Sequence, residues 1–225
     1  MTLVRFIFQI LIPLLPWPIR RVIFCQVFGY KIPRSARISS FSWVYPEKLT
    51  MGQGARIGPL TVAIHLDSIE MGSFATIGRG NWITGHPRKS VAHFVHCEDR
   101  NPCLKMGDHS AITKSHIIDC TDSVLIGAFT TVAGYGSQFI THGIDYETNR
   151  QDCRPISIGS YCLLGTRIVA VCGAVLPDYT VLGAGAVLTG KNVVSWHVYA
   201  GVPAKPVKEI SKGAAYFARP NGFVK

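Results

Sequence analysis

The stretch Thr141–Tyr146, THGIDY, interrupts an otherwise regular apolar rhythm and is followed by a polar run, ETNRQDCRP. His142 stands at the start of this interruption. A neutral histidine with an ordinary pKa of about 6.5 is suited to take a proton from a hydroxyl group. Asp145 follows three residues later, and it either orients the histidine or bonds its own backbone in a turn. His142 is therefore a candidate for general acid–base chemistry.

A second polar stretch, at 85–105, concentrates histidine and charge. Such a cluster either binds a sugar, a phosphate or a membrane surface, or forms a solvated loop. Its polar members are His86, Arg88, Lys89, His93, His96, Asp99 and Arg100. Trp43 and Trp82 precede this stretch, and we expect them in the core rather than in a sugar-stacking platform.

A six-residue repeat separates these polar stretches. The block MGQGARIGPLTV is echoed by MGSFATIGRGNW, MGDHSAITKSHI, IGAFTTVAGYGS and IGSYCLLGTRIV. A period of six fits neither a helix nor a hairpin series, whereas three units make one turn of a triangular solenoid. The repeat predicts an all-β, parallel solenoid over 36–200, with 1–35 as an apolar N-terminal segment and 201–225 as a C-terminal tail. Inward positions late in the frame are Ile158, Leu164, Ala170, Leu176, Leu182 and Leu188.

Two segments leave the frame, at 85–105 and 143–155, and we expect both to protrude at solenoid corners, where solenoids concentrate function. His116 falls where the frame usually has a small inward residue. It is therefore either a second catalytic or acceptor-binding group or a buried, hydrogen-bonded histidine.

Composition narrows the classes of partner. The net charge of +10 favours polyanions, but no long basic run or nucleic-acid-binding motif is present, so we expect no nucleic-acid partner. Seven cysteines without a CxxC pair indicate reduced thiols in a cytoplasmic protein.

The first 30 residues are strongly apolar. They lack a convincing signal-peptide cleavage site, and their uninterrupted apolar run is shorter than the roughly 20 residues of a membrane span. Pro13, Pro16 and Pro18 would also break a long helix. We expect either a peripheral membrane segment, with arginines at the headgroups, or a helix that packs on its own domain or on a partner subunit.

The repeat occurs together with THGID, the long frame from RPISIG to VLTG, and YAGVPAKPVK. With these motifs the chain resembles the hexapeptide-repeat acyltransferases. The maltose, galactoside and xenobiotic O-acetyltransferase branch, which includes enzymes of polysaccharide biosynthesis, is most similar. The resemblance covers about 38–208. It implies a left-handed parallel β-helix, usually a homotrimer with active sites between subunits.

The resemblance also implies chemistry. His142 would be the general base that activates a saccharide hydroxyl toward acetyl-CoA, with no metal, and Asp145 and His116 would be further candidates. We expect a cytoplasmic protein, either free or peripheral at the inner membrane face, and a lipid-linked or growing surface glycan as acceptor would fit the apolar segment. Gly190 departs from the lysine of relatives, with Lys191 one step on. The positions that match coenzyme contacts are Thr166, Ala184, Gly185, Thr189 and Lys205.

Two other classes share this solenoid. A γ-class carbonic anhydrase-like protein would use zinc held by three histidines, and His93 and His96 with His116 or His142 imitate such a set. A non-catalytic β-helical scaffold would use the solenoid alone. Within the acyltransferases, another acyl donor and N-acetylation are further alternatives.

Overall fold

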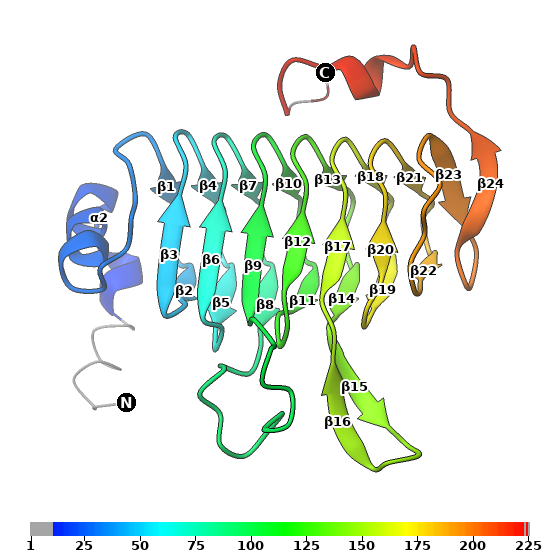
Figure 1. Ribbon diagram of the computed structural model, residues 1–225. Coiled ribbons are helices and arrows are strands. Elements are labelled where there is room, and N and C mark those ends of the chain that lie inside the picture. Colours follow the sequence, from blue (N-terminus) through cyan, green and yellow to red (C-terminus); the bar gives the residue numbers. More distant parts are fainter. Residues whose placement is uncertain (1–10, 223, 225) are drawn as a thin grey trace.

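The structure is a computed structural model and describes residues 11–222 and 224. The chain winds as a triangular β-helix whose three flat faces are parallel sheets, here called sheets A, B and C (Figure 1). Sheet B consists of β1 (Arg37–Ile38), β4 (Arg56–Ile57), β7 (Thr76–Ile77), β10 (Ala111–Ile112), β13 (Thr131–Val132), β18 (Leu163–Leu164), β21 (Val181–Leu182), β23 (His197–Ala200) and β24 (Lys205–Glu209).

The other two faces complete each coil. Sheet C consists of β2 (Trp43–Tyr45), β5 (Val62–Ile64), β8 (Trp82–Thr84), β11 (Ile117–Asp119), β14 (Gln138–Ile140), β19 (Val169–Val171) and β22 (Val187–Leu188). Sheet A consists of β3 (Lys48–Met51), β6 (Ser68–Met71), β9 (Cys103–Met106), β12 (Val124–Ile126), β17 (Ile156–Ile158) and β20 (Val175–Leu176).

The six-residue frame sets this winding, because each unit supplies one short strand and one corner. Arg56 pairs with Thr76, and Leu163 pairs with Val181, so successive coils are 20 residues apart early and 18 late, as the repeat predicts. Aliphatic side chains on the strands of the coils point inward and stack on those of the next coil. The six inward positions predicted from Ile158 to Leu188 are all buried, which confirms the frame.

Aromatic side chains occupy one corner of the solenoid, between sheets A and B. These residues have φ between 56° and 58°, a left-handed conformation that costs an ordinary residue roughly 1 kcal/mol. Their rings stack coil upon coil with centroids 4.5–5.2 Å apart, an arrangement that offsets this cost. We name this set the aromatic column: Phe74, His109, Phe129, Tyr161, Tyr179 and Trp196.

Both ends of the solenoid are covered. At the N-terminal end, η1 (Ile12–Leu14) and α2 (Trp17–Gln26) lie across the first coil, with Ile12 and Phe24 buried (Figure 1). At the other end β24 turns antiparallel to β23. The tail then returns through η2 (Ala215–Ala218) along the aromatic column, where the Phe217 ring lies 5.4 Å from that of Trp196.

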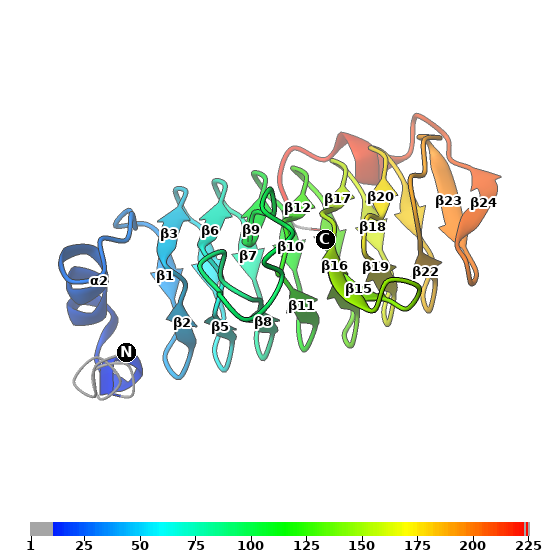
Figure 2. The same ribbon diagram turned by 60° about the horizontal axis from the view of Figure 1, so that its bottom comes forward.

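The two segments outside the frame leave from the same corner, between sheets C and A (Figures 1 and 2). The first insertion follows β8 and is irregular until β9 begins at Cys103. The second is a hairpin of β15 (His142–Asp145) and β16 (Arg150–Cys153), which follows β14. One coil separates them, so they protrude side by side.

Stacking in the aromatic column predicts that removing one of its rings lowers stability more than removing a ring outside the column. Phe129→Ala removes a ring that stacks on both neighbours, so we expect the free energy of unfolding to fall by about 1–3 kcal/mol. Phe41 has the same left-handed backbone, with φ 58°, but its exposed ring lies outside the column, so Phe41→Ala is the matched control. Urea unfolding followed by circular dichroism measures both, and equal losses would contradict a stabilising role for the stack.

Candidate active site

His142 is held by a carboxylate from the preceding coil. Its Nδ1 lies 2.8 Å from Oδ2 of Asp119, the last residue of β11. The His142 side chain is 38% exposed, whereas that of Asp119 is 11% exposed. Because the carboxylate accepts the Nδ1 proton, Nε2 is the nitrogen left to accept a proton from a substrate.

Asp119 is fixed by a dense set of donors. Oδ1 accepts hydrogen bonds from the backbone N–H of Thr121 at 3.1 Å and from its hydroxyl at 2.6 Å. Oδ2 lies 2.8 Å from the backbone nitrogen of Thr141 and 2.7 Å from its hydroxyl. These contacts leave the carboxylate no other rotamer of equal energy, so it presents one orientation to the imidazole.

The pair has opposed pKa shifts. The hydrogen bond to Asp119 raises the pKa of His142 above its ordinary value, and partial burial opposes it. Burial alone would raise the pKa of Asp119, but hydrogen bonds from His142, Thr121 and Thr141 outweigh it and lower that pKa. Asp119 is thus ionised at neutral pH, and the neutral, basic form of His142 becomes the major one only as the pH rises through its raised pKa.

The first insertion packs against His142. The Phe94 ring lies 5.6 Å from the His142 ring, edge to face, and the His86 ring lies 6.2 Å from it. His86 also lies 4.9 Å from His93, whose Nδ1 is 3.3 Å from Oε1 of Gln151 on the hairpin. Burial, followed by the nearby His93 and His142, lowers the pKa of His86, so it contributes a neutral ring beside His142.

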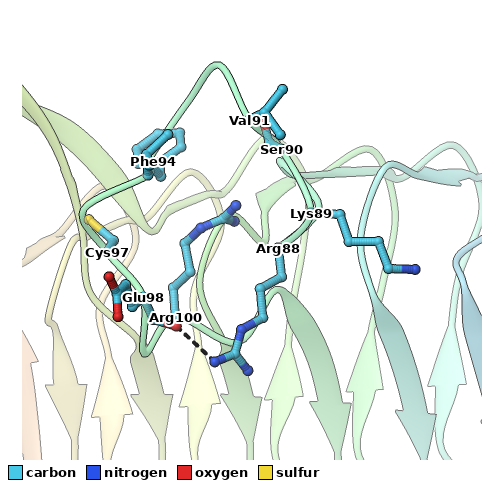
Figure 3. A pocket seen from close by; sticks show the side chains of 9 residues that line it. Arg88, Lys89, Ser90, Val91, Phe94, Cys97, Glu98 and Arg100 are labelled. Carbon is cyan, nitrogen blue, oxygen red and sulfur yellow. Dashed lines mark hydrogen bonds between the residues drawn. The ribbon is translucent and has the colours of Figure 1, made fainter.

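Buried Arg100 organises the first insertion. Its guanidinium donates to the backbone carbonyls of His86, Pro87 and Thr121, and it lies 5.5 Å from the Phe94 ring. It therefore ties both ends of the loop to the solenoid corner. The loop encloses a hollow of about 460 Å³. Beside it Arg88 donates to the carbonyl of Glu98 at 2.8 Å, and Figure 3 shows the side chains that line the hollow. Arg88, Lys89 and Arg100, three charged residues of this polar stretch, line the hollow.

Asp145 is close to His142 in sequence but has other hydrogen-bond partners. It is exposed on β15, and its Oδ1 accepts the backbone N–H groups of Glu147 at 2.9 Å and Thr148 at 3.3 Å. This is the turn-forming arrangement weighed above as the alternative. The structure therefore gives the orienting contact to Asp119 in place of Asp145.

His116 is buried at the opposite edge of sheet C, between β10 and β11. Its Nδ1 accepts the backbone N–H of Ser137 at 3.1 Å, and its Nε2 lies 3.1 Å from the Thr113 hydroxyl. Burial lowers its pKa to about 4. These are the contacts of a buried, neutral, structural histidine, so the structure does not bring His116 into the site around His142.

The predicted coenzyme positions border sheet C. Thr166, Ala184 and Gly185 lie at the corner between sheets B and C, and Thr189 follows β22 at the other edge. The Thr166 hydroxyl donates to the Tyr135 carbonyl at 2.9 Å. Lys205 is exposed at the start of β24. These positions are thus distributed over both edges of sheet C and the start of β24.

Between those edges the outer face of sheet C is largely apolar, and exposed Gln138 is a polar exception between Ile117 and Val169. Trp82 is 52% exposed there, and Ile117 beside it is 46% exposed. Trp82 is thus not a core residue, contrary to expectation, because its neighbour Ile83 takes the inward position. Half-buried valines and isoleucines continue this face toward the C-terminal coils: Ile140, Val169, Val171 and Val187.

Sequence reasoning missed Asp119 and Phe94. The signal for Asp119 was available, because it is an acidic residue at an outward position of an otherwise apolar face, one coil before His142. Phe94 carried no such signal, since its place depends on how an irregular loop folds back.

No protein-family model matches the chain. In sequence it is 28% identical over 141 residues to galactoside O-acetyltransferase of Escherichia coli strain K12. That match covers 61% of this chain and 65% of the relative, so the chain spans just under two thirds of the relative's length.

Solved structures share the fold. The polysialic acid O-acetyltransferase OatWY superposes with a TM-score of 0.58 at 17% identity, covering 82% of this chain and 86% of that one. The N-acyltransferase AntD from Bacillus cereus gives a TM-score of 0.54 at 14% identity, covering 89% and 91%.

The fold is that of the left-handed parallel β-helix, as the sequence predicted. The resemblance to hexapeptide-repeat acyltransferases is likewise confirmed by these relatives.

The structure also bears on metal binding and on membrane-spanning helices. Among the described residues, no group of three His, Cys, Asp or Glu side chains is arranged to hold a metal ion. The helices of the part of the chain that the structure describes are also too short to cross a membrane.

The Asp119 contact makes the pKa of His142 testable. We expect Asp119→Asn to lower that pKa toward about 6.5, because the amide replaces the carboxylate that stabilises the imidazolium. Asp145→Asn is the control and should leave it unchanged, since Asp145 bonds only the turn. Proton NMR titration of the His142 ring measures both, and equal shifts in the two variants would contradict the pairing.

Proposed function

We propose that the protein is an acetyl-CoA-dependent O-acetyltransferase that acts on a saccharide hydroxyl, with His142 as the general base. The observation that carries this proposal is the imidazole–carboxylate pair of His142 and Asp119 at the corner where both insertions leave the solenoid. The sequence likeness to galactoside O-acetyltransferase and the shared fold of OatWY support the same class of reaction.

The geometry fits direct transfer. Nε2 of His142 takes the hydroxyl proton as the substrate oxygen attacks the thioester carbonyl, and Asp119 stabilises the imidazolium that forms. When the tetrahedral intermediate collapses, the C–S bond breaks and the coenzyme thiolate receives the proton from His142. The products are an acetyl ester and free coenzyme A, and no covalent enzyme intermediate is needed because both substrates occupy one site.

Two regions would hold the substrates. The acetyl-CoA arm would lie along the edges of sheet C, against Thr166, Ala184, Gly185 and Thr189, with Lys205 as a point charge for phosphate. The acceptor would enter between the first insertion and the hairpin, where His86, His93 and Phe94 surround His142. A lipid-linked or growing surface glycan in a cytoplasmic setting fits the apolar N-terminal segment.

Replacing the base tests this mechanism. We expect His142→Ala to lower kcat/KM for acetyl transfer about 10²–10⁴-fold while acetyl-CoA still binds, because only proton transfer is lost. Asp119→Asn should lower the rate less, and its pH profile should begin to rise at lower pH than that of the unsubstituted protein. Coenzyme release with hydroxylated acceptors and calorimetry with acetyl-CoA measure the two effects.

Asp145→Asn is the control for these assays and should retain activity. Failure of the unsubstituted protein to bind acetyl-CoA would contradict the proposal. Zinc analysis of the purified protein would then address the carbonic anhydrase-like alternative.

We also propose that the chain is a homotrimer built on sheet C. A second copy packed against Trp82 and Ile117 would cover the apolar face and complete the coenzyme site beside Thr166 and Gly185. A monomer would leave this face in water. The trimer thus accounts for both the exposed tryptophan and the scattered coenzyme positions.

A charge placed on this face tests the assembly. We expect Trp82→Lys and Ile117→Lys to yield monomers, because each buries an unpaired ammonium in the interface. Thr50→Lys, an outward residue on sheet A, is the control. Light scattering after size exclusion gives the mass, and a mass unchanged by all three variants would place the interface elsewhere.

A further inference from the structure

The N-terminal cap has its charge on the inside and its apolar residues on the outside. Arg20 of α2 is completely buried, and its guanidinium donates to the Ser39 carbonyl at 2.9 Å. It also lies 5.6 Å from the Trp17 ring and 5.9 Å from the Phe24 ring. Arg20 thus joins the helix to the first coil and is not free to reach lipid headgroups.

The outward side of the cap is mostly apolar, with exposed Gln26 at the end of α2 as a polar exception. Leu14, Ile19, Val22 and Val27 are each more than half exposed, and so is Leu11. Ile19 and Val22 are three residues apart on α2, so their side chains lie on one stripe of the helix. The patch extends onto the solenoid through exposed Phe41, whose N–H donates to the Pro13 carbonyl at 3.4 Å. We name these six side chains the cap face.

The segment that forms the cap and leads into the first coil carries cations but no acidic residue before Glu47. Residues 1–46 contain six Lys and Arg and no Asp or Glu, the first acid being Glu47. Lys31, Arg34 and Arg37 are all exposed on the first coil, directly next to the cap. An exposed apolar patch with exposed cations on the adjoining coil matches the boundary of an anionic bilayer, where hydrocarbon and phosphate lie a few ångströms apart.

The charge also argues against a second copy as the occupant. A symmetric pairing of two cap faces would bring Lys31, Arg34 and Arg37 of one chain toward the same cations of the other. Like charges at such an interface repel each other, whereas lipid phosphates neutralise them.

We propose that the cap face is a docking surface for an anionic lipid bilayer, which the protein contacts end-on without spanning it. Leu14, Ile19 and Val22 enter the boundary between headgroups and acyl chains, while Lys31, Arg34 and Arg37 contact lipid phosphates. The solenoid then extends away from the membrane, with the insertions and His142 several coils from the surface (Figure 1). This docking does not depend on the chemistry at His142, but it gives the proposed lipid-linked acceptor a physical basis.

Vesicle flotation of the full-length protein tests the docking. We expect the protein to float with vesicles of phosphatidylcholine and phosphatidylglycerol and to stay in solution with phosphatidylcholine alone. The double variant Ile19→Ser with Val22→Ser should lose about tenfold or more in vesicle affinity. The matched control is Val202→Ser with Val207→Ser, two exposed valines at the opposite end of the molecule.

A charge variant separates the two contributions. Replacing Lys31, Arg34 and Arg37 by glutamine should weaken binding to the anionic vesicles about tenfold or more, and added salt should weaken binding of the unsubstituted protein. Circular dichroism and the thermal midpoint establish that each variant is folded.

Three outcomes would overturn the proposal: no flotation of the unsubstituted protein, equal flotation with both lipid mixtures, or equal binding by the cap-face and control variants. A change of mass in the Ile19→Ser, Val22→Ser variant without any vesicle binding would assign the cap face to a second copy. Acetyl transfer to a soluble acceptor, measured on the same samples, should be unchanged by the cap-face variant. Failure of the docking is thereby distinguishable from failure of the proposed enzyme activity.

Discussion

Each coil of this protein buries its aliphatic side chains only against the coils on either side. Ile57, for example, is covered by Ile38 and Ile77, its partners in the neighbouring strands of sheet B. The strands are two to five residues long and would not be stable alone, so the registration of one coil on the next carries the whole structure. Any change that shifts a strand by one residue would turn its inward aliphatic to the solvent.

The same registration builds the candidate site. Asp119 pairs with Ile140 across sheet C, and His142 follows two residues later. Two side chains 23 positions apart in sequence are thus brought within a hydrogen bond by strand pairing alone. The hairpin and the first insertion then only need to enclose a pair that the solenoid has already positioned, and buried Arg100 supplies the anchor for one of them.

Much of this architecture was predictable because six-residue periodicity is a strong constraint. The inward positions, the 20- and 18-residue coils and the two protruding segments all follow from it. Asp145 illustrates where the sequence left two alternatives open. It is close to His142 in sequence, but on a hairpin strand its carboxylate bonds the backbone of the turn, and proximity in a solenoid comes from the next coil. The aromatic corner carried no such signal, since Phe129 and Tyr161 take a left-handed conformation whose cost their mutual stacking offsets.

The corner from which both insertions leave has a further consequence for how such a chain can change over evolution. β8, β11 and β14 keep their register with one another although the connections that follow them differ in length. The number of residues that connect sheet C to sheet A at this corner is therefore not fixed by packing in the core. Lengthening a loop costs only about 0.6 kcal/mol for each doubling, which is small beside the burial of one coil. New segments can therefore be added beside His142 while the strands that hold Asp119 stay as they are. Selectivity for one acceptor over another can diversify by insertion and deletion at this corner, without loss of the fold.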